Sequence, residues 1–451
     1  MFRIASAAVL ATVALFSIAL LRGEDPSPAP SYVAHEWGTF TSMQGSDGVT
    51  LEGLQHEEEG LPDFVYSRSE VRTCPLREFG YKGLEVDVEN VTKKMETPVI
   101  YFYADQPLHV RARVCFNHGL LTQWYPVSDL LGPAEAKPED GPLDMAKVEK
   151  SYLEWGVDVL GKGAGLDKIP ACEAGSPWEA QRIPDANVVR TDARKAPRMG
   201  PQEHEKFIFY RGLGRFELPL VAKTLGDGYM DARVSLTNNS AEPVRHLFIV
   251  NIRGSVAGWR YAKEAPAGGT VELMCPITKV AKTVEGMIAE LRPALEAKLV
   301  EEGLYPKEAE SMVRTWERSY FKTQGLRILY IVPRSMVDRV LPLALDPAPK
   351  ELVRVLVGRL ECVTPGEEAT VLAAVRGWSS QDGPTRAKSL ADLNKLGRFL
   401  EPHVRRVLTL STDEVVLANA KAILAGIHSN AEEVRGLEEK KELPKKDVKK
   451  K

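Results

Sequence analysis

The chain carries little net charge for its length. Its 451 residues include 59 Lys and Arg against 62 Asp and Glu, which gives a formal charge of −3. This balance excludes the overall basic field with which proteins attract duplex nucleic acid. A hydrophobic fraction of 44% and a charged fraction of 27% exclude disorder throughout the chain.

Long apolar runs are also scarce, because only one occurs, from Ile4 to Leu21. A protein with several membrane spans is therefore excluded. Arg3 precedes the run and Ser17-Ile18-Ala19 resembles a cleavage site, so residues 1–23 are predicted to be an export signal, followed by a linker over 24–31. An uncleaved membrane anchor of the same length stays open, although cleavage is favoured. We expect a periplasmic or extracellular protein.

Cysteines are few, and none of them forms a C-x-x-C pair. They occur at Cys74, Cys115, Cys172, Cys275 and Cys362. This spacing excludes a zinc ribbon. An exported chain can form disulfides, but an odd number leaves at least one thiol without a partner in the chain. Alternatively, several are small buried hydrophobic residues.

The order of sequence patterns predicts an α+β fold. Residues 108–115 alternate apolar and polar side chains, as expected for a strand with one wet face. The segment 233–273 resembles an immunoglobulin-like sandwich in its turns. The predicted parts are an antiparallel, β-sandwich-like region (32–275), a helix pair with strands (276–363), a HEAT-like helical hairpin (364–430) and a charged, disordered tail (431–451).

Helix boundaries carry the most specific local signals. Thr364-Pro-Gly-Glu367 is a capping box with Pro in the first helical position, and it predicts a helix over 367–377. Two more helices are expected, over 388–408 and 413–427. A helix over 284–302 should stop at Gly303, and Pro293 either kinks it or divides it in two.

The densest group of chemically active residues follows the linker, at His35-Glu36-Trp37. A histidine beside a carboxylate can act as a general base or bind a metal, which makes His35 and Glu36 the catalytic candidates. The alternative, which we favour, is a first β-strand whose aromatic side chains build the core. His56-Glu57 is a second pair of this kind. If the two segments meet, His35, His56 and Glu57 would suit a divalent metal, the one cofactor these residues suggest.

Aromatic residues offer a different type of site. Trp37, Trp124, Tyr125 and Trp259 are the candidates for a binding surface on which a sugar would stack. The competing interpretation is that they are core residues, as most tryptophans are in sandwiches. The expected partner classes are a carbohydrate, a peptide or an envelope protein, with no nucleic acid among them.

Two regions of the chain, taken together, carry a resemblance to a known family. They are His35-Glu-Trp-Gly-Thr-Phe-Thr-Ser42 and a second stretch with Thr315-Trp316, Gly325 to Pro333, Leu341-Pro-Leu343 and Val355 to Arg359. Both resemble an uncharacterised family of exported bacterial proteins. The resemblance implies export and brings no activity, cofactor or catalytic residue.

No complete catalytic motif is present: the chain has no G-x-S-x-G elbow, no phosphate-binding loop and no dinucleotide fingerprint. The sequence therefore favours an exported binding or cell-envelope interaction module. The alternative is a secreted hydrolase or metalloenzyme that uses His35 and Glu36. A third hypothesis is a C-terminal helical scaffold for a protein partner.

Overall fold

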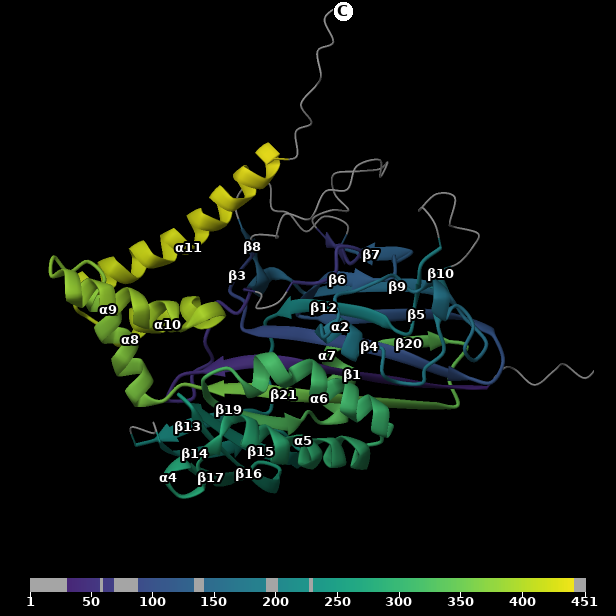
Figure 1. The fold of residues 1–451 in the computed structure, drawn as a ribbon, viewed down its shortest axis with the longest axis horizontal. Coiled ribbons are helices and arrows are strands. Elements are labelled where there is room, and N and C mark those ends of the chain that lie inside the picture. The colour runs from purple at the N-terminus through teal and green to yellow at the C-terminus, as the bar shows by residue number, and fades with distance from the viewer. Residues whose placement is uncertain are drawn as a thin grey trace, which may run out of the picture.

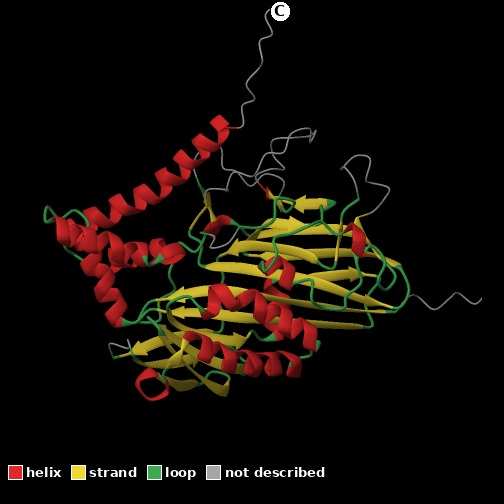
Figure 2. Cartoon of the chain, viewed as in Figure 1, coloured by secondary structure: helices red, strands yellow, loops and turns green. Residues whose placement is uncertain are grey.

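The computed structural model describes residues 31–56, 60–68, 88–133, 142–191, 202–226 and 230–441. The predicted export signal, Cys74 and Glu57 lie outside the described residues. Within them the chain is an α+β protein, as the sequence predicts (Figures 1 and 2). None of the helices in these ranges has the length and apolar character needed to cross a membrane.

The largest layer is a mixed sheet whose described part has ten strands. Their order in space is β18 (Lys282–Thr283), β16 (Val256–Ala265), β15 (Val244–Arg253), β19 (Gly325–Ile331), β21 (Glu351–Cys362), β1 (Tyr32–Gln44), β4 (Lys93–Ala104), β12 (Ile208–Gly214), β6 (Gly119–Tyr125) and β2 (Tyr66–Ser67). The two halves of this sheet meet where β1, near the start of the chain, pairs with β21, far along it. The segment 276–363 contributes β19 and β21 to its centre.

Strand β1 occupies a central position, because β4 pairs with one of its edges and β21 with the other. The β1–β4 pair, within the region predicted to be antiparallel, is antiparallel, whereas β1 and β21, a strand of the segment 276–363, pair in parallel. An apolar run shows that a strand is buried and does not specify the direction of its neighbour. The parallel pair requires a long connection, which the helices and strands between β1 and β21 provide.

A second sheet packs against the first. Its strands are β11 (His204–Glu205), β10 (Val189–Thr191), β9 (Lys150–Val159), β5 (Leu108–Asn117) and β20 (Leu343–Asp346), with β7 (Leu130–Gly132) also paired to β9. In β5, Leu108, Val110, Ala112 and Val114 are buried while His109 and Arg111 are exposed, which confirms the predicted alternation. The ring of Trp155 in β9 lies 6.3 Å from that of Tyr210 in β12, so the two sheets share one core.

The remaining strands of the described residues form two smaller sheets. One consists of β13 (Leu220–Leu225), β14 (Asp231–Asn238) and β17 (Thr270–Pro276), and the other pairs β3 (Val88–Glu89) with β8 (Leu143–Asp144). The segment expected to form an immunoglobulin-like unit is divided between sheets, since β14 and β17 pair with each other while β15 and β16 belong to the large sheet.

Helices α5 (Val284–Glu301) and α6 (Pro306–Phe321) lie side by side across one face of the large sheet (Figure 1). Pro293 stays inside α5, which remains a single helix, and Gly303 follows its end with a φ of 108°. That backbone conformation favours glycine and confirms the predicted stop. The shorter helices are α2 (Pro177–Ala180), α4 (Ile277–Val280) and α7 (Arg334–Val340), with 3-10 turns η1 (Met145–Lys147) and η2 (Leu166–Lys168).

The C-terminal helices form a group beyond one end of the large sheet (Figure 1). They are α8 (Pro365–Gly377), α9 (Gly383–Asn394), η3 (Gly397–Phe399), α10 (Leu400–Leu410) and α11 (Glu414–Lys441). The capping box at Thr364 and Glu367 is present, as predicted. The single helix predicted over 388–408 is wrong, because Gly397 adopts a φ of 51° and separates α9 from α10. Helix α11 continues through residues 431–441, which the sequence predicts as disordered.

Candidate functional site

His35 and Glu36 lie in the middle of β1, and both are buried, with exposed fractions of 1% and 0%. Since successive side chains of a strand point to opposite faces, the two residues belong to different surroundings. His35 faces α6, where its Nδ1 lies 2.7 Å from Oε2 of Glu308. Glu36 points to the other face of the sheet, where the hydroxyl of Tyr210, from β12 of the same sheet, donates to it.

Two tyrosines, Tyr103 and Tyr305, surround the His35–Glu308 pair. The Tyr103 hydroxyl donates to Glu308 at 2.8 Å, and the backbone N–H of Tyr305 donates to it at 2.7 Å. A carboxylate accepts hydrogen bonds without donating them, so Nδ1 of His35 is the donor in this contact. The ring of Tyr305, 41% exposed, lies 4.4 Å from the imidazole and covers it.

The Glu36 network is fully paired. Arg354 donates from Nε to Glu36 at 2.5 Å, from Nη1 to Asp338 at 2.6 Å and from Nη2 to the carbonyl of Leu341 at 2.6 Å. Burial opposes the charge of Arg354, but the adjacent Glu36 carboxylate raises its pKa above the usual value. Both oxygens of Glu36 are therefore occupied, which leaves the carboxylate no open oxygen for a general-base role.

His56 occupies a separate place at the C-terminal helices. Its Nε2 lies 2.7 Å from Oε2 of Glu401 in α10, and Arg405 donates to the other oxygen of Glu401 at 2.7 Å. His35 and His56 thus bind carboxylates of different helices. No group of three or more potential metal-ligating side chains occurs within the described ranges, and Glu57 lies outside them.

The predicted aromatic surface is largely inside the protein. Trp37, Trp124 and Tyr125 have exposed fractions of 0%, 1% and 3% and belong to the main core. A stacking platform needs an accessible ring face, and these three rings have none. Trp259 is different, because it is only partly buried and packs against Phe248 at 6.0 Å between ring centroids.

The four described cysteines are all free thiols, and Cys115, Cys275 and Cys362 are buried. This agrees with the interpretation of these three as small hydrophobic residues. Burial raises the pKa of the Cys275 thiol to about 11, so this thiol is a poor nucleophile near neutral pH.

A cluster of buried charges was missed by sequence reasoning, and we call it the basic cluster. Its cations are Lys94, Arg327, Arg359 and Arg398, and its carboxylates are Glu96 and Glu361. Lys94, Arg327, Arg359 and both glutamates come from strands of the large sheet, whereas Arg398 comes from η3 at the C-terminal helices. The available signal was charge inside apolar strands, a position where lysine and arginine are rare unless paired.

Electrostatics within the basic cluster keep both carboxylates ionised. Burial opposes the charge of Glu96, but Arg398 and Lys94 lower its pKa far below the usual range. Burial likewise opposes the charge of Glu361, and Arg327 and Arg359 lower its pKa. Burial lowers the pKa of Arg327 to about 10, so this guanidinium remains charged at neutral pH.

Arg359 is the centre of this cluster and is fully buried. Its Nε donates to Glu361 at 2.6 Å, and its guanidinium carbon lies 4.1 Å from the ring centroid of Tyr320. Both Nη1 and Nη2 are buried without a hydrogen-bond partner among the described residues. Two nitrogen donors of one charged guanidinium, both removed from water and both unpaired within the described residues, form an unusual arrangement.

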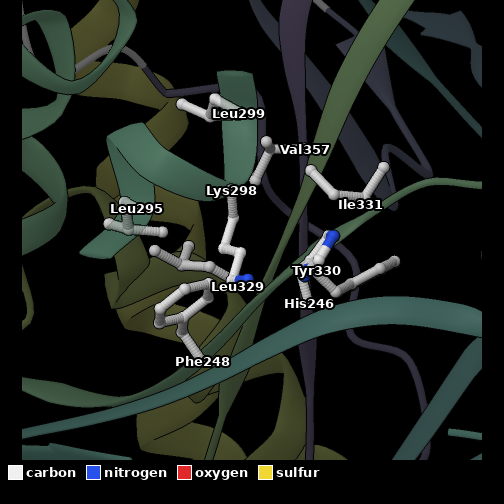
Figure 3. Close-up of a pocket in the computed structure, with 9 residues that line it drawn as sticks. All are labelled: His246, Phe248, Leu295, Lys298, Leu299, Leu329, Tyr330, Ile331 and Val357. Atoms are coloured by element: carbon white, nitrogen blue, oxygen red, sulfur yellow. The ribbon is translucent and has the colours of Figure 1, made fainter. Parts of the chain in front are cut away.

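A second polar group lies beside α5. His246 contacts the Tyr261 hydroxyl through Nδ1 at 2.9 Å and Glu302 through Nε2 at 3.1 Å. It borders a small cavity of about 10 Å³, which is room for about one water molecule (Figure 3). The remaining lining is mostly apolar, apart from Lys298 (Figure 3).

Comparison with known proteins adds no assignment. No family model matches the chain, and no curated protein matches it. Among solved structures, the chain is similar to the yeast delta-COP-I mu-homology domain with a TM-score of 0.23 and 5% sequence identity, over 74% of this chain and 95% of that one. A similarity at this level carries no argument about function.

Proposed function

We propose that the protein is an exported binding module that captures a ligand through an oxyanion, a phosphate or carboxylate group, at the basic cluster. One observation carries this proposal: Nη1 and Nη2 of Arg359 are fully buried and have no partner within the described part of the chain. The carbohydrate, peptide and envelope-protein classes expected from the sequence all include anionic members.

The pairing of Arg359 supports an anionic ligand. It shares Glu361 with Arg327, and its Nη1 and Nη2 are buried without a hydrogen-bond partner among the described residues. A buried donor of a charged group is costly to leave unpaired, whereas a hydrogen-bonded anion offsets that cost. An oxyanion would accept hydrogen bonds from both Nη atoms.

The orientation of Arg359 supports the same conclusion. Its guanidinium lies over Tyr320, and the ring of Phe399 is 5.7 Å from it. The bond from Nε to Glu361 fixes the plane of the group. The two Nη atoms are then positioned for the paired hydrogen bonds that arginine makes with carboxylate and phosphate.

The location of the cluster is also suited to ligand capture. Arg359 and Glu96 belong to the large sheet, whereas Arg398 and Phe399 belong to η3. Binding sites occur preferentially at junctions between structural units. A ligand at this junction would contact the sheet and the C-terminal helices together.

Titration calorimetry with inorganic phosphate, and separately with citrate, tests this proposal on the purified mature protein. We expect Arg359→Lys to weaken binding at least about tenfold, because lysine keeps the charge and loses the paired donors. The matched control is Arg376→Lys, whose native side chain is 60% exposed and pairs with Asp413 on the surface. Absence of binding by the unaltered protein, or equal binding by the Arg359 variant, would contradict the proposal.

Export and the finer description of the fold belong to the same proposal. Cleavage after Ala19 predicts a mature chain that begins at Leu20, and intact-mass measurement of the protein from its native host tests this. A mass that includes Met1, in a membrane fraction, would instead support the anchor. We further propose that the two large sheets form the layers of a β-sandwich and that α8–α11 pack in a HEAT-like manner.

A second candidate function is hydrolysis at His35, and the His35–Glu308 pair is the observation in its favour. Glu308 accepts a hydrogen bond from Nδ1 at 2.7 Å, and Nε2 is the ring nitrogen that this contact does not use. Metal analysis and ester hydrolysis should be measured together for the unaltered protein and for His35→Ala. Loss of either property in the variant supports this function, and absence of both from the unaltered protein contradicts it.

A further inference from the structure

We propose that Tyr261 is a nucleophile, activated by His246 and oriented through Glu302, that accepts the acyl group of an activated carboxylic ester. The three side chains come from different elements: Tyr261 from β16, His246 from β15 and Glu302 from the end of α5. This site is independent of the basic cluster and of the function proposed for it.

The hydrogen bonds set the direction of proton transfer. A carboxylate only accepts, so the 3.1 Å contact with Glu302 places the proton of His246 on Nε2. Its Nδ1 then carries a lone pair and accepts the hydrogen bond from the Tyr261 hydroxyl at 2.9 Å. A nucleophile, a base and a group that orients the base follow one another, the arrangement used in nucleophilic catalysis.

The backbone at His246 is held in an uncommon conformation. Its φ is 56°, in the left-handed region, and the pairing of β15 with β19 shifts register between Arg245 and Phe248. Such a conformation is uncommon in a residue other than glycine and is concentrated at functional sites. The bulge turns the imidazole toward Tyr261 and Glu302.

The proposed base is buried, whereas the proposed nucleophile is accessible to solvent. His246 is 4% exposed, whereas Tyr261 is 38% exposed and within reach of a dissolved reagent. Burial lowers the pKa of His246, an effect that the charges of Glu302 and Glu301 oppose and that of Lys298 supports. An imidazole with a lowered pKa is neutral at pH 7 and can accept a proton.

The surroundings of Tyr261 suit an acyl group. Trp259 stands two residues away on the same face of β16, and both rings pack on Phe248, at 6.0 Å and 5.0 Å. These rings offer an apolar surface for the hydrocarbon part of an ester. The ammonium of Lys298 lies 5.6 Å from the Tyr261 ring and can neutralise developing negative charge.

The proposed step balances without an oxidant or a metal. The phenolic oxygen of Tyr261 forms a bond to the carbonyl carbon of the ester, and its proton moves to Nδ1 of His246. The bond between that carbon and the leaving oxygen breaks. The leaving group departs as an alcohol or phenol with the proton returned by the imidazolium, and Tyr261 remains as an acyl ester.

Incubation of the full mature protein with p-nitrophenyl acetate tests this step, with p-nitrophenol release and peptide mass as readouts. We expect one acetyl group on Tyr261. In Tyr261→Phe this adduct should vanish, and in His246→Asn the rate should fall about a hundredfold. Asparagine is chosen because it tolerates the left-handed backbone better than most residues. Tyr152→Phe is the matched control, since Tyr152 is a partly exposed tyrosine on β9 of the second sheet.

Glu302→Gln tests the positioning role separately. Glutamine keeps a hydrogen-bonding side chain but removes the negative charge that raises the pKa of His246. The midpoint of the pH–rate profile should therefore move to lower pH, a change that a merely structural role would not produce. Acetylation spread over several tyrosines, or an unchanged rate in a folded His246→Asn protein, would overturn the proposal.

Discussion

Glu36 and His35 are neighbours in the chain, yet each is held by its own set of partners. Glu36 accepts hydrogen bonds from Arg354 and Tyr210, and His35 contacts Glu308. Removing one member of a buried ion pair leaves the other charge without compensation, which is more costly than losing a surface contact. We therefore expect the buried ion pairs at the centre of the large sheet to contribute to the free energy of unfolding.

Glu36→Gln should consequently destabilise the protein by about 3 kcal/mol, because the charge of Arg354 loses its buried partner. Urea denaturation followed by circular dichroism measures this free energy. Glu264→Gln on β16 is the control, since Glu264 is exposed, and should change stability by less than about 0.5 kcal/mol. Equal effects of the two substitutions would show that the Glu36 network contributes little.

At the scale of elements, the position of β19 and β21 is the most consequential feature. They lie between β15 and β1 in the large sheet. Two strands of the region 32–275 are thus separated by strands that come later in the chain. Without β19 and β21, β15 and β1 would each have one edge without a paired strand. Their apolar faces would also lose part of the core.

A fragment limited to residues 24–275 should therefore fail to fold, although the sequence patterns describe it as one β-rich region. We expect weak chemical-shift dispersion in its NMR spectrum and rapid proteolysis, in contrast to the chain from residue 24 to 451. A fragment with a cooperative thermal transition would mean that the first region folds without the strands that follow it.

At the scale of the whole molecule, Glu401 joins the N-terminal segment to α10. It accepts hydrogen bonds from His56, Gln55 and Arg405. Burial would raise the pKa of Glu401, but the hydrogen bonds from His56 and Arg405 hold it at about 2. A carboxyl with a depressed pKa in the folded state stabilises the protein above its unfolded pKa, near 4.3.

The contribution of Glu401 should therefore be complete at neutral pH and be lost as the pH falls from about 4.5 to about 2. Thermal unfolding across this range tests the expectation. In Glu401→Gln the melting temperature should fall at pH 7, by the equivalent of about 1–2 kcal/mol, and its acid dependence should flatten. Parallel curves for variant and unaltered protein would contradict the assigned role.

The local sequence determined the elements that depend on neighbouring residues. Side-chain alternation predicted β5, and the capping box predicted the start of α8, because propensity and capping act within a few residues. The class of fold, α+β, followed from the order of such elements. The helix predicted over 388–408 was wrong where Gly397 adopts a left-handed backbone, a conformation that periodicity alone does not reveal.

Only the tertiary structure decided which residues meet. The parallel pairing of β1 with β21 brings Arg354 to Glu36 and Arg359 to the face beneath α6, across most of the length of the chain. The bulge at His246 brings Tyr261 and Glu302 together in the same way. Low net charge is a property of composition. The concentration of buried charge around Arg359 depends on contacts between distant segments, and no local pattern encodes such contacts.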